Sequence, residues 1–534
     1  MGMARLLPTG IQDFEKVRRG GHVYVDKTAV IHRLVSGTEG AYFLSRPRRF
    51  GKSLLCSTLG AVFEGKRELF GEVAGYPALA IDSLGWEWKK HPVIRLDLNA
   101  GVYSNGVEAL YAVLYAELQE AAERNGIALL EQTPLVTVGS QFKHLIRKAC
   151  EKAGERVVVI VDEYDKPLLA TLDLPEIHEQ LKNELKGFYG VLKSSDEYLR
   201  FVFITGVTKF ARVSVFSDLN HLDDITLDPF YADICGLTQE ELVQTFGPEI
   251  DAVLTKAGRE RGQYMEELRR FYNGYRFSPK PLTVYNPFGL LLHFKKGGEF
   301  QPYWYESGTP TFLINLIKNQ KINIADMSNM RVRNEDFRKY DTHNMRAAPM
   351  LYQCGYLTIS DYNEKRNEYT LDYPNLEVSY SFANSLMEQY LQVPEDRSQA
   401  LFSKLPDALE EGNIEDTINA LRQFLAGVPY DIIKETENYY QTVVFLIFKI
   451  LGLNCRAEVR VAAGRIDTMV EAGDFVYCFE FKLNKGADAA MAQIAEKDYL
   501  LPWKGSGKRL YKVGVDFDYE KRNIGEWKYE EAGA

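Results

Sequence analysis

In the first half of the chain, short apolar runs alternate with longer stretches in which apolar residues recur at helical spacing. Val157–Val161 is a continuous β-branched run, which is typical of a strand buried on both faces. Such alternation of strands and helices predicts a parallel β-sheet with helices on both sides. The predicted strands are Ala41–Ser45, Pro92–Leu98, Val157–Val161 and Leu199–Thr205, and the predicted helices are Lys52–Phe63, Gly106–Asn125, Gln141–Ala153 and Glu176–Ser194.

The pattern changes near Tyr272, where turn-forming pairs such as Asn273-Gly274 and Asn286-Pro287 accumulate, and we place a domain border there. The region that follows, as far as Val428, has a mixed, mostly helical pattern. The remainder predicts the order αβββαβ, with elements at Glu437–Leu451, Cys455–Val461, Ile466–Glu471, Phe475–Leu483, Ala487–Leu501 and Leu510–Val515. The sequence therefore predicts an α/β chain with domains at residues 1–275, 276–428 and 429–534.

The composition excludes several classes of protein. With 46% apolar and 26% charged residues, the chain has the make-up of a globular protein. No apolar run approaches the roughly 18–20 residues that span a bilayer, and the first residues lack the pattern of a signal peptide. The six cysteines are scattered, so neither a clustered zinc site nor a disulfide framework is indicated. We therefore expect a cytoplasmic protein that makes no contact with a membrane.

Charge and histidine content limit the chemistry further. The net charge is −10, whereas proteins that coat nucleic acid are usually basic. Any contact with nucleic acid is therefore expected to be local or assisted by a bound cation. All eight histidines lie at or before His343, so chemistry in the last third of the chain must use carboxylates and lysines.

The segment Ser45–Ser53 lies between a predicted strand and a predicted helix and ends in Gly51-Lys52-Ser53, as a phosphate-binding loop (P-loop) does. A glycine lets backbone N–H groups approach phosphate, a lysine reaches the outer phosphates, and a serine hydroxyl can hold Mg²⁺. The general pattern has glycine where this chain has Arg46. The alternative is a basic surface loop in which these three residues have no shared role.

Two carboxylates support the nucleotide interpretation. The buried strand Val157–Val161 delivers Asp162 and Glu163 to its C-terminal end, the edge at which ligands bind in open α/β sheets. Asp162 would orient the magnesium shell, and Glu163 would polarise an attacking water. The alternative is an ordinary helix N-terminus rich in acidic residues.

A second cluster of charged residues lies near the C-terminus. Glu480 and Lys482 stand two residues apart on one strand and so share a face. Pairing about Gly473 brings Asp467 nearly opposite Glu480, and Glu458 on the preceding strand can reach the same face. Oxygen ligands of this kind hold Mg²⁺ or Mn²⁺, and a lysine beside them can stabilise developing negative charge. The alternative is a salt-bridged strand face.

Six motifs make the sequence resemble a large bacterial family, and the resemblance covers nearly the whole chain. Members of this family join an AAA-type (STAND-like) ATPase domain to a domain of the PD-(D/E)XK nuclease superfamily, which has the restriction-endonuclease-like fold. The motifs are Gly10–Phe14, Tyr24–Thr28, Phe43–Ser53, Val161–Pro167, Thr205–Phe210 and Tyr352–Leu357.

The resemblance implies roles for individual residues. Arg46 is usual in the family's loop, Lys52 and Ser53 would bind phosphate and Mg²⁺, and Asp162 and Glu163 would be the Walker B pair. Thr205 or Lys209 would lie in the region that senses the γ-phosphate. Asp467, Glu480 and Lys482 match the nuclease pattern, and Gln493 and Lys497 on the next helix resemble it too.

These observations predict an ATP-binding and hydrolysing module coupled to a Mg²⁺-dependent nuclease module that acts on DNA or RNA, with Tyr272–Val428 relaying between them. A homo-oligomer is compatible with this organisation. Two alternatives stay open. One is a nucleotide-driven regulatory switch whose nuclease-like domain only binds nucleic acid or a protein partner. The other is a nucleotide-independent nuclease with a vestigial P-loop.

Overall fold

A computed structural model describes residues 5–37, 40–209, 216, 222–305, 311–320, 322, 327, 329–337, 346–391, 405–428, 436–451, 454–461 and 464–532. The chain packs into two compact units. The first consists of Met1–Trp304 and Arg331–Thr370, and the second of Tyr305–Met330 and Leu371–Ala534. The polypeptide thus passes between the units at three points. The domain borders placed after residues 275 and 428 remain a prediction.

The first unit is built on a five-stranded sheet in the order β2-β3-β4-β1-β5. All its neighbouring strands are parallel, so their carboxyl ends share one edge. Every residue of β3 is buried, as its continuous β-branched run predicts. The strands are β1 Ala41–Ser45, β2 Val93–Asp97, β3 Val157–Asp162, β4 Leu199–Gly206 and β5 Leu222–Asp224.

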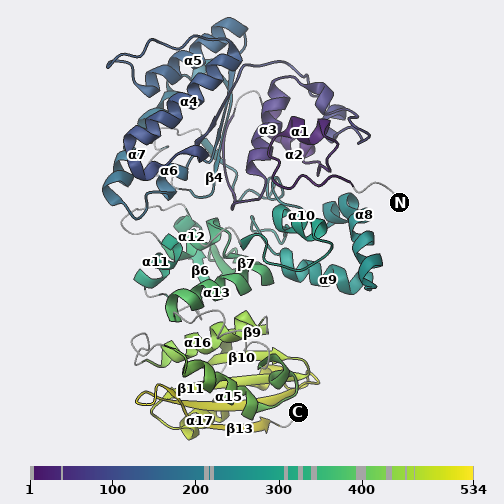
Figure 1. Ribbon diagram of the computed structural model, residues 1–534, viewed down its shortest axis with the longest axis vertical. Coiled ribbons are helices and arrows are strands. Elements are labelled where there is room, and N and C mark those ends of the chain that lie inside the picture. Colours follow the sequence, from purple (N-terminus) through teal and green to yellow (C-terminus); the bar gives the residue numbers. More distant parts are fainter. Residues whose placement is uncertain are drawn as a thin grey trace. The chain divides into compact units, whose positions relative to one another are not determined.

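Helices cover both faces of this sheet (Figure 1). On one side lie α4 (Val107–Asn125), α5 (Val138–Ala153) and α7 (Pro175–Lys193); on the other lie α1 (Phe14–Arg19), α2 (Thr28–Val35) and α3 (Lys52–Phe63). The parallel sheet with helices on both faces is the architecture that the alternating pattern predicts. The short β5 was not anticipated, because three residues are too few to show a period.

The first unit continues into three further helices, α8 (Gln239–Ala257), α9 (Arg261–Tyr272) and α10 (Pro287–Lys295). The helix α8 begins with a capping box, in which Thr238 and Glu241 satisfy each other's backbone N–H groups. A hydrophobic cluster joins these helices to Val23 of the N-terminal segment and extends past residue 275 to Tyr303. The N-terminal segment is thereby held close to the helices that follow the sheet.

The middle of the chain combines short strands and helices. A three-stranded sheet has the order β6-β8-β7, with bounds Met330–Arg333, Glu368–Asp372 and Thr358–Asn363. The helix α12 (Ala347–Gln353) is mostly buried and leads through Gly355 toward β7. The remaining long helices are α11 (Thr311–Asn319), α13 (Leu376–Leu391) and α15 (Ile414–Leu425).

The second unit contains a mixed five-stranded sheet in the order β13-β12-β11-β10-β9. Its elements are α16 (Glu437–Ile450), β9 (Asn454–Val461), β10 (Gly464–Ala472), β11 (Phe475–Leu483), α17 (Ala487–Lys497), β12 (Arg509–Asp518) and β13 (Asn523–Ala532). The helices α16 and α17 lie on opposite sides of the sheet (Figure 1). The predicted order αβββαβ is present, and β13 is an addition. Across the residues described, no helix combines the length and the hydropathy that a bilayer crossing requires.

Candidate functional sites

The segment Ser45–Ser53 joins β1 to α3 at the carboxyl edge of the first sheet. Gly51 has a φ of 93° and caps the helix, so the turn requires a residue that tolerates left-handed backbone. Lys52 and Ser53 are the first two residues of α3. Their backbone N–H groups therefore belong to the free donors of a helix N-terminus, which favour an anion.

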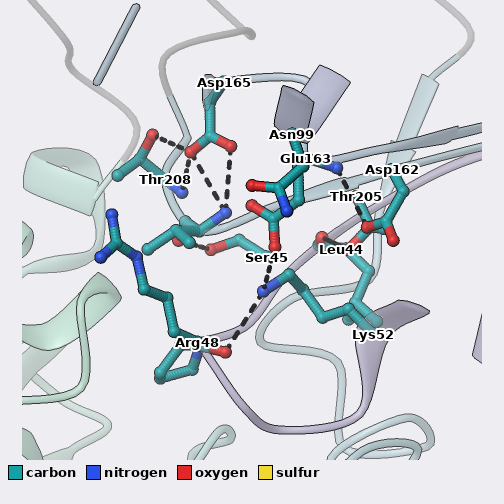
Figure 2. Close-up of polar contacts among 12 residues, drawn as sticks. Leu44, Ser45, Arg48, Lys52, Asn99, Asp162, Glu163, Asp165, Thr205 and Thr208 are labelled. Atoms are coloured by element: carbon teal, nitrogen blue, oxygen red, sulfur yellow. Dashed lines mark hydrogen bonds and ion pairs between the residues drawn. The ribbon is translucent and has the colours of Figure 1, made fainter. Parts of the chain in front are cut away.

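The Lys52 side chain is almost fully buried, with 3% of its surface exposed. Its Nζ lies 3.2 Å from Oε1 of Glu163 and donates a hydrogen bond of 3.3 Å to the carbonyl oxygen of Pro47 (Figure 2). Burial by itself lowers the pKa of Lys52, but the carboxylates of Glu163 and Asp162 raise it above its ordinary value. The ammonium group therefore stays charged at the centre of the site.

Asp162 ends β3 and is held beside the start of α3. Burial and the nearby Glu163 carboxylate raise the pKa of Asp162 to about 6, although Lys52 and a hydrogen bond with the Ser53 side chain favour the ionised form. A polar cavity of about 310 Å³ adjoins Ser53 and Asp162. The hydroxyl and the carboxylate are oxygen ligands suited to Mg²⁺, and the cavity gives room for its water molecules.

The sequence interpretation missed Asp165, although it lies in one of the quoted motifs. Its carboxylate is fully buried and accepts hydrogen bonds from the backbone N–H groups of Val207 and Thr208, at 3.1 and 2.6 Å, and from the Thr208 hydroxyl at 2.6 Å. The segment after β3 is thereby tied to the segment after β4 (Figure 2).

Thr205 and Lys209 lie at the same edge of the sheet, but both side chains bond to protein groups. The Thr205 hydroxyl donates to the carbonyl oxygen of Leu44 at 2.7 Å. The Lys209 Nζ lies 2.9 Å from a carboxylate oxygen of Asp224 on β5, and both side chains are nearly buried. The structure thus places these residues beside β1 without directing them at the P-loop lysine.

Arg46, which stands where the general pattern has glycine, has a structural role. It is fully buried, and its guanidinium donates to the carbonyl oxygens of Ser45, Thr226 and Tyr231 at 2.9–3.0 Å. It also stacks on the ring of Phe277, with 4.2 Å between the guanidinium carbon and the ring centroid. This arginine therefore fills the space behind the loop.

The two other arginines of the loop differ from Arg46 and from each other. Arg49 donates to the carbonyl oxygen of Tyr303 at 3.0 Å and lies 3.9 Å from the centroid of the Phe288 ring. The side chain of Arg48 is exposed. Of the three arginines, Arg48 is the most exposed to solvent.

A largely apolar cavity of about 110 Å³ adjoins Gly51. Its lining comes from the N-terminal segment, α3, the stretch before α8 and α8 itself, which contribute among others Val25, Leu54, Leu237 and Phe246. A planar aromatic group attached to a phosphate chain could enter here, because the cavity adjoins the start of the phosphate-binding helix.

In the second unit, the register of β10 and β11 places Thr468 opposite Phe479, so Asp467 and Glu480 are the next facing pair. The turn between the strands contains Gly473 at a φ of 52°. Lys482 Nζ donates to Glu480 Oε1 at 2.8 Å, and the Asp467 carboxylate accepts a 2.8 Å hydrogen bond from the backbone N–H of Phe481. Asp467, Glu480 and Lys482 therefore converge.

The Glu480 carboxylate has a raised pKa and one oxygen atom that accepts no hydrogen bond within the described residues. Burial and the Asp467 carboxylate raise the pKa of Glu480 to about 7, despite the hydrogen bond from Lys482. Its second oxygen, Oε2, is buried and accepts no hydrogen bond from any residue that the structure describes. An orphaned acceptor is costly unless a donor or a cation binds it, so this atom fits the chemistry of a divalent cation site.

Glu437, the first residue of α16, is a further member of this cluster that the sequence interpretation missed. Its carboxylate lies 3.9 Å from Lys482 Nζ and 3.6 Å from Lys485 Nζ. The sequence could have indicated Glu437, because it is an acidic residue in the first turn of the helix that precedes the three strands.

Two other residues named from the sequence have different outcomes. The side chain of Glu458 lies outside the described residues, and Gln493 donates to the Tyr499 hydroxyl at 3.3 Å. Within the described ranges, no three His, Cys, Asp or Glu side chains are arranged to hold a metal ion.

Comparisons with known proteins match two parts of the chain to two families. Residues 8–216 match the family described as "Predicted AAA-ATPase", and residues 435–527 match the PD-(D/E)XK nuclease superfamily. The "Uncharacterized protein in vnfD 5'region" of Azotobacter chroococcum mcd 1 is 36% identical over 532 residues, covering 97% of each chain. The match to the solved ORC2 protein of Aeropyrum pernix (ADPNP-ADP complexes) covers 65% of this chain and 87% of that protein, with 11% identity and a TM-score of 0.26.

Arg46→Ala should destabilise the first unit, because it leaves a cavity and removes the donor from three carbonyl oxygens, two of them in buried hydrogen bonds. We expect the free energy of unfolding to fall by about 3 kcal/mol. Arg48→Ala, at an exposed position of the same loop, should change it by less than about 0.5 kcal/mol. Urea unfolding of the full chain measures both variants. Equal effects would contradict the structural role of Arg46.

The pKa of Glu480 predicts a pH dependence of stability. In the folded protein this carboxyl keeps its proton up to about pH 7, whereas its ordinary pKa is 4.5. The folded state therefore binds more protons in this window, and the stability that Glu480 contributes is lost as the pH rises through about 7. Glu480→Gln, which stays neutral, should thus gain stability over the wild type at about pH 8 relative to about pH 5.

Thermal unfolding without divalent cations at the two pH values measures this difference. Glu471→Gln is the matched control, because Glu471 lies on β10 and pairs with Lys508 at 2.9 Å in a half-exposed position. If the difference in thermal midpoint between the wild type and Glu480→Gln is the same at both pH values, the raised pKa of Glu480 is refuted.

Proposed function

Because the chain belongs to the family that joins a predicted AAA-ATPase domain to a domain of the PD-(D/E)XK nuclease superfamily, we propose that it couples ATP hydrolysis to the cleavage of phosphodiester bonds. The observation that supports ATP binding and hydrolysis is the contact of 3.2 Å between the buried Lys52, at the start of α3, and Glu163. The proposed cleavage of phosphodiester bonds rests on the convergence of Asp467, Glu480 and Lys482. The segment Tyr272–Val428 would relay between the two activities.

The proposed ATP site follows from the geometry around Lys52. The phosphates bind the N-terminus of α3 and the Lys52 ammonium, and the base enters the apolar cavity beside Gly51. Bound Mg²⁺ neutralises phosphate charge, and Ser53 and Asp162 are the residues that would hold it.

Hydrolysis assigns a second role to Glu163. When the phosphates bind Lys52, the Glu163 carboxylate loses its partner and can accept a proton from an attacking water. Thr205 lies near the end of β4 and Lys209 follows this strand, which lies between β1 and β3. We assign both residues to the region that responds to the γ-phosphate.

The proposed nuclease site uses the face of β10 and β11 that carries Asp467 and Glu480. A divalent cation at such a site polarises the scissile phosphate and lowers the pKa of a bound water. Asp467 and Glu480 would hold the cation, with Glu458 as a further ligand. Lys482 would leave its carboxylate partner and stabilise the negative charge that develops on the phosphate oxygens. The substrate is DNA or RNA. Because the protein has a net charge of −10, its contact with this polyanion is local.

One observation favours the alternative of a regulatory switch that binds without cutting. The Lys482 ammonium, which catalysis requires, already forms a hydrogen bond of 2.8 Å to Glu480 and lies 3.9 Å from Glu437. A site closed by these ion pairs could serve only to bind nucleic acid or a protein partner. Cleavage assays with Mg²⁺ or Mn²⁺, on plasmid and on RNA, with and without ATP, separate this alternative from the main proposal.

Lys52→Ala should reduce ATP affinity at least about 100-fold, because the phosphates lose their buried ammonium partner. Glu163→Gln should bind ATP at least as tightly as the wild type, since it no longer holds Lys52 by an ion pair, but hydrolyse it about 100-fold more slowly. Calorimetry and phosphate release measure the two effects. Unchanged affinity in Lys52→Ala would remove the P-loop assignment.

Asp467→Ala and Glu480→Ala should each abolish cation-dependent cleavage and leave ATP binding intact, because each removes a carboxylate from the proposed cation site. Lys482→Ala should lose cleavage by about 100-fold or more while it still binds Mn²⁺, because the lysine acts on the phosphate charge. Glu471→Ala on β10 is the matched carboxylate control and should cleave normally. Cleavage that survives both carboxylate substitutions would exclude this site, and a wild type that binds nucleic acid but never cuts it would favour the switch.

A further inference from the structure

The tripeptide Gln353-Cys354-Gly355 belongs to a sequence motif to which the proposed function gives no role. It ends α12 and leads toward β7, about 300 residues after the P-loop in the sequence and within the same compact unit. Gln353 and Cys354 are buried. The residues at its two ends contact two different loops of the proposed ATP site.

The first contact is made by Gln353, whose side-chain oxygen accepts a 3.1 Å hydrogen bond from the backbone N–H of Lys209. Lys209 follows directly on Val207 and Thr208, whose N–H groups donate to the buried Asp165 carboxylate. The backbone after β4 is therefore held from two sides. Asp165, two residues beyond Glu163, binds one part of it, and Gln353 binds the next residue.

The second contact is made by Gly355, which has a φ of 88°. A Cβ atom at this position would lie 2.8 Å from the Cβ of Pro47 and 3.3 Å from the ring of Trp304. Pro47 is the P-loop residue whose carbonyl oxygen accepts from Lys52 Nζ. Gly355 thus permits a close approach to the P-loop that any larger residue would prevent.

The ring of Trp304 completes this contact. Its indole N–H donates to the carbonyl oxygen of Arg48 at 3.1 Å, and its ring packs edge-on against Tyr356, with 5.5 Å between the centroids. The P-loop backbone at Pro47 and Arg48 is therefore enclosed by Gly355 and Trp304. A bound phosphate requires this stretch of backbone to keep a defined shape.

We propose that Gln353 and Gly355 are positioning residues for ATP turnover, an inference that rests on the proposed ATPase function. Gly355 keeps the P-loop in the conformation that binds phosphate. Gln353 keeps the segment after β4 in the position from which this segment acts on the γ-phosphate. Two residues of one buried tripeptide thereby fix the distance between the loop that binds ATP and the loop that responds to it.

The two contacts predict different kinetic effects. Gln353→Leu keeps the side-chain volume but removes the acceptor, so kcat should fall at least tenfold with ADP affinity unchanged within twofold. Gln353→Glu retains an acceptor oxygen and should recover most of kcat. Gly355→Ala pushes on Pro47, so ADP should bind at least tenfold more weakly.

Matched controls in the same unit distinguish positioning from packing. Gln141 is buried, and its amide forms hydrogen bonds of 3.0 and 2.7 Å with the backbone of Leu130 on an unrelated loop. Gln141→Leu should lower the thermal midpoint and leave kcat unchanged. Gly298 has a φ of 91°, and a Cβ there would meet Val253. Gly298→Ala should likewise be destabilised but bind ADP normally.

The experiment uses the full chain, with ADP affinity from calorimetry, kcat from phosphate release and the thermal midpoint of each variant. A kcat of Gln353→Leu equal to that of Gln141→Leu, or failure of Gln353→Glu to recover activity, would overturn the role of Gln353. Normal ADP affinity in Gly355→Ala would overturn the role of Gly355. If the wild type binds ADP but hydrolyses no ATP, the proposed hydrolysis and the role of Gln353 fall together, while ADP affinity still decides the role of Gly355.

Discussion

The Asp165 carboxylate, fully buried, accepts hydrogen bonds from two backbone N–H groups and one hydroxyl on the segment after β4. A buried carboxylate without such donors would be strongly unfavourable, so these bonds fix the two loops beyond β3 and β4 relative to each other. The position of Glu163 on one loop, and of Thr208 and Lys209 on the other, follows from this link. The Lys52–Glu163 contact, and with it the charge of the P-loop, depends on that arrangement.

Both candidate sites place a lysine and a glutamate against each other at the end of a buried strand. Lys52 and Glu163 lie 3.2 Å apart, and Lys482 and Glu480 lie 2.8 Å apart. In each site a further carboxylate stands close by, and burial raises the pKa of an acid, Asp162 in one case and Glu480 in the other. Each site thus holds more carboxylate than its lysine can balance. An added cation would relieve that imbalance, which is the common physical basis for proposing metal-dependent chemistry at both.

The three arginines of the P-loop, which lie within four consecutive positions, have different environments. Arg46 is buried among backbone carbonyl oxygens, Arg49 lies over an aromatic ring, and Arg48 is exposed. The delocalised, planar guanidinium suits both the carbonyl-rich pocket and the ring face. A glycine in place of Arg46 would leave that pocket empty, so this loop obtains its shape from the segments packed behind it.

Local pattern determined much of the fold. The β-branched run predicted β3, the tight turn at Gly473 predicted the pairing of β10 with β11, and the spacing of Glu480 and Lys482 put both on one face, because strand periodicity is set by neighbouring residues. The polar, half-exposed β13 and the three-residue β5 carried no such signal. The burial of Arg46, the partners of Asp165 and Lys209, and the approach of Glu437 to Lys482 were decided only by the tertiary structure. Each joins residues far apart in the chain, and local periodicity does not determine which distant segments meet.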